Sequence, residues 1–97
     1  MRHEIILAPE AVEDFRRLRA NDRAALKEAM ERHLRHEPEK VSKSRIKRLR
    51  GLRRPQYRLR IEETRVFYDV IGNRVEILAI VPKSKALEWL KEKGEKI

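Results

Sequence analysis

Along residues 57–70, YRLRIEETRVFYDV, apolar and polar residues alternate on both sides of a short polar break. Alternation with a period of two is typical of strands that bury one face of a sheet. The pattern predicts two antiparallel strands, residues 57–62 and 65–71, joined by an even-length turn centred on Glu63 and Thr64. Because the turn lacks Gly and Asn, a four-residue loop of the same parity is as well supported as a tight turn.

An even-length turn determines which residues of these two strands face each other. The expected apolar pairs are Tyr57 with Val70, Leu59 with Tyr68, and Ile61 with Val66. A second turn follows at Gly72 and Asn73, which tolerate a positive φ, and it predicts a third strand that ends at Pro82. In that strand, Val75 should face Val70, Ile77 should face Tyr68, and Ala79 should face Val66 on the apolar side.

The opposite, mixed face of the sheet is expected to bring three arginines together beside an exposed aromatic side chain. A rigid sheet holds guanidinium groups in a fixed pattern, which suits a phosphate that must be bound in one geometry. Alternatively, Arg58 pairs with Asp69 and Arg65 with Glu62, as surface ion pairs that contribute about 0–1 kcal/mol each. Phosphate binding is favoured, because Arg60 has no acidic residue directly opposite. The members of this face are Arg58, Arg60, Arg65, Phe67, Leu78 and Ile80.

The remaining apolar patterns predict helices and one further strand. Residues 3–8 are a short isoleucine-rich run that predicts a strand, and Pro9 suits the first position of a helix. Apolar residues then recur at helical spacing, first over residues 11–18 and again in a second helix, which gives an antiparallel helical hairpin. Ser84 predicts the start of a short last helix that ends at Gly94.

Residues 37–44 and 45–56 have no such period. The first segment predicts a loop, and the second is too basic and too interrupted by Gly51 and Pro55 for regular core structure. The whole pattern predicts one α+β domain, residues 1–97. Its helical hairpin packs on one face of an antiparallel sheet that includes a three-stranded meander.

Composition restricts the chemistry. The chain has 97 residues, no cysteine and three scattered histidines, so no metal and no cofactor are expected. His33 falls on the apolar side of its helix, where a packed histidine is more common than a catalytic one. No window approaches the roughly 20 apolar residues of a membrane span. A cytoplasmic protein without a membrane partner is therefore expected.

Charge gives the first indication of function. The net charge is +9, and residues 43–65 alone contribute +8, with ten basic and two acidic residues. A solvated basic surface is the plain alternative, but so local an imbalance favours binding of a polyphosphate through guanidinium groups and counterion release. The candidate contacts to such a polyphosphate in and beside this segment, which the family resemblance described next implies to be RNA, are Lys47, Arg48, Arg50, Arg53, Arg54 and Phe67.

Three stretches carry a family resemblance: APEAVEDFRRL, then RIKRLRG followed by YRLRIEETRVFYDV, and finally VEILAIVPKS with ALEWL. With the predicted order of elements, they resemble the RelE-like branch of the RelE/ParE superfamily of toxins from bacterial and archaeal toxin–antitoxin modules. The resemblance covers essentially the whole chain. RelE-like members are ribonucleases that enter the ribosomal A site and cut messenger RNA without a metal, whereas ParE-like members share the fold and target DNA gyrase.

The resemblance implies roles for individual residues. Arg58, Arg60 and Arg65 match the sheet positions that RelE-like toxins use on the scissile phosphate. Lys85, as a catalytic residue, and Lys83, as an RNA contact, fall near the family's later basic position. The implied reaction is attack of a ribose 2′-OH on the adjacent phosphate, which gives a 2′,3′-cyclic phosphate or its opened product. Arginine stabilises the anion but is no general base, since its pKa exceeds about 12.

One family feature is missing. Some RelE-like enzymes have a tyrosine in or near the last helix that takes part in proton transfer. Here Tyr57 and Tyr68 are expected on the core face, and Trp89 or Lys91 stands where that tyrosine is expected. Tryptophan cannot transfer a proton, so a lysine is left as a weak acceptor and activity on free RNA should be poor.

The resemblance thus implies a toxin that acts as a metal-independent, ribosome-dependent mRNA endoribonuclease. Its expected partners are the ribosome, mRNA and a cognate antitoxin. Because the mixed face would expose Phe67, Leu78 and Ile80, the antitoxin should combine acidic residues with an amphipathic helix or strand. Two alternatives stay open: a ParE-like DNA gyrase inhibitor, and a catalytically weak basic RNA-binding module.

Overall fold

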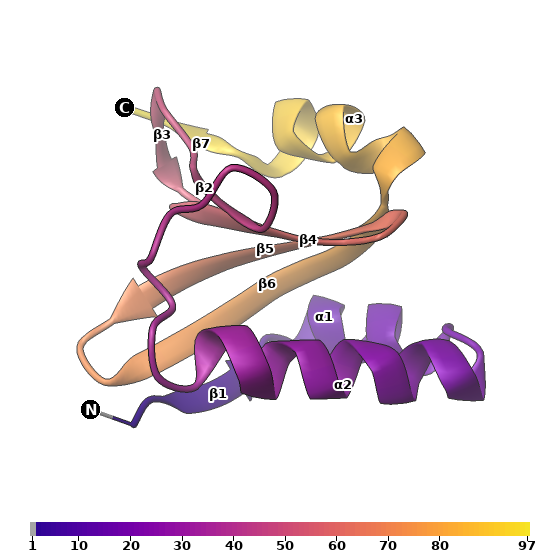
Figure 1. The fold of residues 1–97 in the computed structure, drawn as a ribbon. Coiled ribbons are helices and arrows are strands. Elements are labelled where there is room, and N and C mark those ends of the chain that lie inside the picture. Colours follow the sequence, from indigo (N-terminus) through magenta and orange to yellow (C-terminus); the bar gives the residue numbers. More distant parts are fainter. Residues whose placement is uncertain (1) are drawn as a thin grey trace.

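Residues 2–97 are described by the computed structural model, and they form an α+β fold, as predicted (Figure 1). Helices α1 and α2 lie together on one side of the main sheet, and α3 lies on the other side (Figure 1). The elements are β1 Glu4–Leu7, α1 Pro9–Arg16, α2 Ala20–Leu34, β2 Ile46–Arg48, β3 Leu52–Arg54, β4 Tyr57–Ile61, β5 Thr64–Ile71, β6 Arg74–Pro82, α3 Lys83–Lys93 and β7 Glu95–Lys96.

The main sheet has five strands in the order β1-β6-β5-β4-β2, and β3 pairs with β7 in a second, two-stranded sheet. The predicted meander, β4-β5-β6, is confirmed. The prediction of a purely antiparallel sheet is wrong, because β1 pairs with β6 in parallel. No hairpin turn joins β1 to β6, and the helical hairpin that follows β1 leaves its direction unconstrained.

The predicted register of β4 and β5 is shifted by two residues. The turn between them consists of Glu62 and Glu63 alone, since Ile61 lies opposite Thr64. Glu62 makes this tight turn possible by adopting a φ of 51°. Because side chains alternate with a period of two, a shift of two residues leaves every side chain on its predicted face. The observed pairs are Tyr57 with Tyr68, Arg58 with Phe67, Leu59 with Val66, and Arg60 with Arg65.

The main hydrophobic core lies between this sheet and the helical hairpin. Leu59, Val66, Tyr68 and Ile77 are fully buried there, as predicted, and Ile61 is partly buried. The helices contribute buried residues at helical spacing, namely Ala11 from α1 and Leu26, Met30 and Leu34 from α2. These contacts cover one face of the sheet, and α3 packs against part of the other face (Figure 1).

A bulge in β6 changes the faces of two residues. The Gly-Asn turn pairs Val70 with Val75 and Tyr68 with Ile77, as predicted, but the register then shifts and Phe67 pairs with Ala79. Leu78 is therefore the extra residue, and Ile80 moves to the helix-facing core opposite Val66. The prediction that Ala79 faces the helices and Ile80 the mixed side is wrong. The main-chain N–H of Ile80 donates to Asp14 Oδ2 of α1 at 2.9 Å, which stabilises this arrangement.

The basic segment 45–56, predicted to lack regular structure, contains β2 and β3. Strand β2 forms the edge of the main sheet and buries Ile46 in the core, while β3 pairs with the C-terminal β7, which was not predicted. Both strands are short and owe their structure to pairing rather than to an apolar pattern of their own, β2 with the nearby β4 and β3 with the distant β7. No helix in the described part of the chain is long and apolar enough to span a membrane.

Candidate functional site

Positively charged side chains form a ladder across the sheet face opposite the helical hairpin. Arg60 on β4 lies directly opposite Arg65 on β5, and Arg58 shares their face two residues before Arg60. Lys47 on the edge strand β2 lies opposite Arg58 and extends the row. The predicted clustering of the three arginines is confirmed in its backbone geometry.

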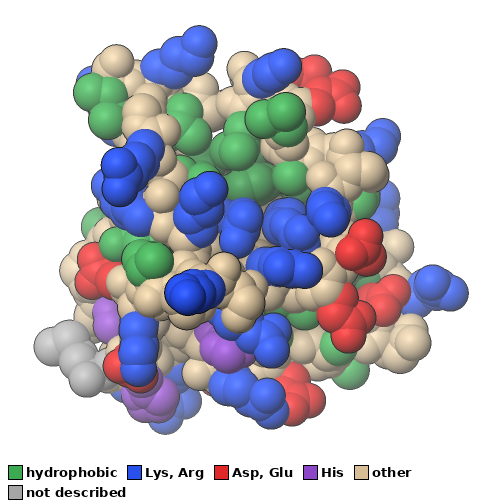
Figure 2. Space-filling model, turned by 45° about the horizontal axis from the view of Figure 1, so that its top comes forward, with side chains coloured by type: hydrophobic (Ala, Val, Ile, Leu, Met, Phe, Trp, Pro, Cys, Tyr) green, Lys and Arg blue, Asp and Glu red, His purple; other side chains and the backbone are tan. Residues whose placement is uncertain are grey.

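The N-terminus of α3 adds a further cation at one end of this row. The main-chain N–H of Lys83 donates to the carbonyl oxygen of Glu63 at 2.7 Å, which brings the start of α3 beside the β4–β5 turn. We call Lys47, Arg58, Arg60, Arg65 and Lys83 the basic face. Figure 2 shows Lys and Arg side chains gathered across the middle of the visible surface, with acidic side chains mostly around them.

Arg58 is poorly neutralised by the protein. Its Nε is buried, and it is the only such side-chain nitrogen or oxygen within residues 2–97 that has no hydrogen-bond partner. Burial lowers the pKa of Arg58, and the charges of Arg65 and Arg60 lower it further. A buried donor beside two like charges is a site that an anion would complete.

Arg65 is more buried than predicted, with only 6% of its surface exposed. Its Nη1 donates to the carbonyl oxygens of Glu62 at 2.7 Å and Thr64 at 3.0 Å. The side chain therefore braces the β4–β5 turn as well as contributing charge to the basic face. The alternative ion pair with the Glu62 carboxylate does not form in the described structure.

The prediction of an exposed aromatic on this face is wrong. Phe67 is fully buried, because α3 lays Trp89 over it with ring centroids 5.0 Å apart and planes 5° apart. The Trp89 Nε1–H donates to Glu10 Oε1 at 3.3 Å. Phe67 therefore cannot stack on a base in this conformation. Leu78 and Ile80 are also buried, so the apolar side chains expected on the surface are absent from it.

The two tyrosines lie in the core, as predicted. Tyr57 and Tyr68 stack with ring centroids 5.5 Å apart, and the Tyr68 hydroxyl donates to the Pro38 carbonyl oxygen at 2.6 Å. Burial raises the pKa of both Tyr57 and Tyr68. Neither phenol is placed or tuned to accept a proton at the basic face.

Two of the predicted RNA contacts have partners within the protein. Arg54 pairs with Asp69 Oδ2 at 3.0 Å and with Glu76 Oε1 at 2.6 Å, so two carboxylates already balance its charge. The alternative ion pair between Arg58 and Asp69 is not formed in the described residues. Arg48 lies 5.2 Å from the centre of the Tyr57 ring and donates to a main-chain carbonyl, yet remains exposed.

The other predicted contacts are exposed and lie outside the main sheet. Arg50 lies in the loop between β2 and β3, Arg53 lies on β3, and Lys85 lies in the first turn of α3. The described part of the chain also contains no group of three His, Cys, Asp or Glu residues arranged to hold a metal.

Comparison with known proteins assigns the family. A family model described as the ParE toxin of the type II toxin-antitoxin system parDE matches residues 5–87. The chain belongs to this toxin family. It is therefore a toxin of a type II toxin–antitoxin system within the RelE/ParE superfamily, as predicted. No curated protein sequence matches the chain.

Solved structures show the same fold at low sequence identity. A mutant of the E. coli RelE toxin in its free state has a TM-score of 0.72 and 22% identity, over 95% of this chain and 94% of that one. An archaeal RelE–RelB complex from Pyrococcus horikoshii OT3 contains a chain with a TM-score of 0.71 and 23% identity, over 88% and 99%. A chain of the RelBE2 toxin–antitoxin complex from Mycobacterium tuberculosis has a TM-score of 0.67 and 22% identity, over 84% of this chain and 99% of that one. The fold is thus that of RelE toxins.

Proposed function

We propose that this toxin is a ribosome-dependent mRNA endoribonuclease that needs no metal of its own. The observation that carries the proposal is the row of Arg58, Arg60 and Arg65 on one rigid sheet face, with Arg58 Nε buried and unpaired within residues 2–97. Arginine rather than lysine suits this role, because a planar guanidinium donates two parallel hydrogen bonds to a phosphate. Similarity to RelE structures supports the proposal through the shared fold.

The proposed reaction is an in-line displacement at phosphorus. The ribose 2′-oxygen forms a bond to the adjacent phosphorus, the bond from phosphorus to the 5′-oxygen breaks, and a 2′,3′-cyclic phosphate results. Arg58, Arg60 and Arg65 stabilise the extra negative charge that develops on the phosphoryl oxygens. Lys85 takes the proton from the 2′-OH, and water protonates the leaving 5′-oxygen. Most of the rate enhancement comes from charge stabilisation by the arginines and from orientation by the ribosome.

We also propose that a cognate antitoxin neutralises the toxin by covering the basic face. The buried positions of Phe67, Leu78 and Ile80 change the expected apolar contribution, because these residues have no surface to offer. Leu87 on α3 is 66% exposed and is the apolar anchor beside the cations. An acidic segment with an apolar residue for Leu87 would match both features. The proposed substrate places the site of action in the cytoplasm.

A second candidate function is inhibition of DNA gyrase, which the ParE name of the matching family model favours. The basic face would then bind a protein or DNA surface without any cleavage of RNA. The two functions share the fold, so only an activity measurement separates them. A basic RNA-binding module without catalysis is the third outcome of the same measurement.

The test uses purified toxin, ribosomes programmed with one defined mRNA, and mapping of the 5′ ends by primer extension. Discrete cuts in ribosome-bound mRNA and almost none in free mRNA are expected. Arg60→Gln should abolish most of the cutting, while Arg53→Gln removes an equal charge from β3 and should leave cutting at saturating toxin nearly intact. Intact mRNA together with loss of gyrase supercoiling activity would establish the second candidate instead. If the mRNA stays intact, gyrase stays active and the toxin still binds ribosomes, the protein is a basic RNA-binding module without catalysis.

A further inference from the structure

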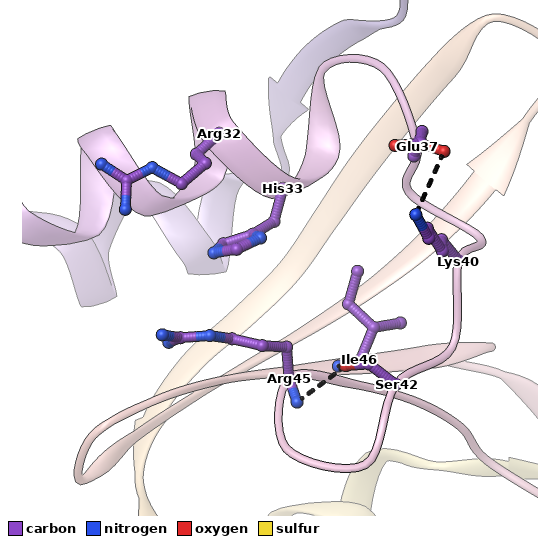
Figure 3. Close-up of a pocket in the computed structure, with 7 residues that line it drawn as sticks. All are labelled: Arg32, His33, Glu37, Lys40, Ser42, Arg45 and Ile46. Carbon is purple, nitrogen blue, oxygen red and sulfur yellow. Dashed lines mark hydrogen bonds and ion pairs between the residues drawn. The ribbon is translucent and has the colours of Figure 1, made fainter.

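A second cationic site lies at the C-terminal end of α2, outside the basic face. A cavity of about 270 Å³ opens there between α2, the loop after it and the start of β2 (Figure 3). That volume equals about nine waters at roughly 30 Å³ each, which leaves room for a phosphodiester group and part of its hydration. The residues that line the cavity are Arg32, His33, Glu37, Lys40, Ser42, Arg45 and Ile46.

Two nitrogen-bearing side chains approach each other across this space from two elements. His33 projects from α2 toward the Arg45 side chain, which runs beneath it from the residue before β2, while the Arg32 side chain extends along α2 at the rim (Figure 3). The surrounding carboxylates are already engaged, since Glu28 accepts from Arg32 at 2.8 Å and Glu37 lies 3.8 Å from Lys40 Nζ. Arg45 has no side-chain hydrogen bond or ion pair among residues 2–97. Among the described residues that line the cavity, Arg45 is therefore the cation whose charge no carboxylate of the protein balances.

Arg45 connects this cavity to the basic face. Its main-chain N–H donates to Ser42 Oγ at 3.0 Å, and its carbonyl oxygen accepts from the Arg60 N–H at 2.9 Å. A second, shallower hollow is lined by Ser44, Arg45, Arg60 and Glu62. Arg45 therefore borders both hollows, and the second hollow also contains Arg60 of the basic face.

We infer that this cavity, formed by Arg32, His33 and Arg45, binds an RNA phosphodiester adjacent to the one at the basic face. The inference rests on the proposed function in that the ligand is RNA, but it does not require cleavage. The site positions the strand and takes no part in the chemistry. A further cationic contact to the phosphate backbone increases affinity by counterion release and helps to determine the orientation of the bound strand.

Binding at this site should depend on pH through His33. Burial lowers the pKa of His33, and the charges of Arg45 and Arg32 lower it further. The charged or titratable groups that face His33 are Arg32 on α2, Glu37 and Lys40 in the following loop, and Arg45 before β2. A bound phosphate favours the imidazolium, so it should raise the pKa of His33. RNA affinity should accordingly fall as the pH rises through the His33 pKa of the complex.

The first experiment measures binding of a six-nucleotide 2′-O-methyl RNA, which has no free 2′-OH and cannot be cut, as a function of salt. Arg45→Gln should weaken binding several-fold and reduce the slope of log K against log salt by about 0.7, the value for one phosphate contact on a single strand. The control, Arg16→Gln, removes the same charge from an exposed position on α1, which packs at the opposite, β1 edge of the sheet. Equal changes for the two variants would overturn the inference.

The second experiment follows the His33 ring by NMR across pH, with and without the same RNA. An upward shift of the His33 pKa on binding is expected, and His33→Gln should remove the pH dependence of RNA affinity while the protein stays folded. A His33 ring that titrates identically in free and bound protein would overturn the inference even if Arg45→Gln were misfolded.

Failure of the inference and failure of the proposed function have different signatures. If the toxin makes discrete cuts in mRNA, but Arg45→Gln does not weaken RNA binding and RNA does not shift the His33 pKa, then the nuclease function stands and the second site is refuted. If both measurements respond but no mRNA is cut, then the cavity is an RNA-binding site and the nuclease function is refuted. Binding of the toxin to ribosomes with and without mRNA identifies the source of the phosphodiester. If Arg45→Gln weakens binding only when mRNA is present, the phosphodiester belongs to mRNA. If Arg45→Gln weakens binding equally in both cases, it belongs to ribosomal RNA.

Discussion

Arg60 lies directly opposite Arg65 on the adjacent antiparallel strands β4 and β5, although both side chains are positively charged. Like charges at directly opposed positions of a sheet destabilise it. Arg58, two residues away, has a buried Nε without a partner in residues 2–97. The sheet therefore carries an unfavourable arrangement that a bound phosphate would relieve, as is common where stability is sacrificed for function.

Removal of one charge from this pair should stabilise the free toxin. Arg60→Gln eliminates the repulsion and should increase the free energy of unfolding by about 0.2–1 kcal/mol at low salt, with a smaller gain at high salt. Urea denaturation at two salt concentrations measures this. Arg53→Gln, an equal change of charge at an exposed position on β3, is the control and should have a smaller effect. A loss of stability in Arg60→Gln would show that Arg60 has a favourable partner in solution.

Arg65 should affect the cutting rate more than ribosome binding. Arg65→Ala should lower the rate on programmed ribosomes on the order of 10²-fold, by analogy with removal of one oxyanion donor, and Arg65→Lys should also lower it because the planar fork is lost. Single-turnover cutting at saturating toxin separates rate from binding. Arg48→Gln or Arg53→Gln should instead weaken binding and leave the rate nearly unchanged. Equal rates for wild type and Arg65→Ala would leave the basic face as a docking surface only.

Glu62 holds a backbone conformation that favours glycine, with φ at 51°. Glu62→Gly should therefore stabilise the turn by roughly 0.5–1 kcal/mol, despite the greater flexibility of the unfolded chain. Glu63→Gly is the matched control, because Glu63 is not in this conformation, and it should be neutral or destabilising. Thermal unfolding of the two variants tests the assignment of the turn. The same gain in both would indicate relief of surface charge rather than of backbone strain.

Trp89 should contribute far more to stability than Leu87, its neighbour on α3. Trp89 covers the buried Phe67 ring, whereas Leu87 is 66% exposed. Trp89→Ala should reduce the free energy of unfolding by about 2–4 kcal/mol, and Leu87→Ala should change it by less than about 0.5 kcal/mol. Urea denaturation followed by circular dichroism measures both. Similar small changes would mean that α3 is not held on the sheet in solution.

The contribution of Asp69 to the free energy of unfolding should increase as the solution is acidified. Burial raises the pKa of Asp69, an effect only partly opposed by the Gln56 N–H and the Arg54 charge. A carboxyl whose folded pKa lies above its unfolded value binds more protons in the fold. Its contribution is therefore greatest at low pH and is lost as the pH rises from the unfolded pKa to the folded one.

The comparison that isolates this effect is wild type against Asp69→Asn from pH 3 to pH 7. Asparagine retains an oxygen that can accept from the Gln56 N–H, an interaction that spans 2.8 Å in the structure. The unfolding free energy of wild type relative to the variant should rise on acidification. Glu92→Gln, a change at an exposed carboxylate, serves as control. A relative fall would show that the Arg54 ion pair dominates and that the folded pKa lies below the unfolded one.

Local sequence patterns are enough to assign residues to the two faces of the central meander. The period of two assigns Leu59 and Tyr68 to the core and Arg58, Arg60 and Arg65 to the opposite side, and an error of two residues in register does not change that assignment. The helical hairpin and the Gly-Asn turn were similarly predictable, because helical spacing and a positive φ at Gly72 are local properties. The candidate arginine cluster follows from these local patterns alone.

Only the tertiary structure decided how each face is used. The bulge at Leu78 exchanges Ala79 with Ile80, whose N–H donates to Asp14 of α1, and Trp89 on α3 buries Phe67 although it lies more than twenty residues further along the chain. Pairing with the C-terminal β7 likewise gives β3 its structure. These outcomes depend on the packing of residues remote in sequence, which no local period encodes. The same physical reason explains why His33 and Arg45 reveal their shared cavity only in the folded chain.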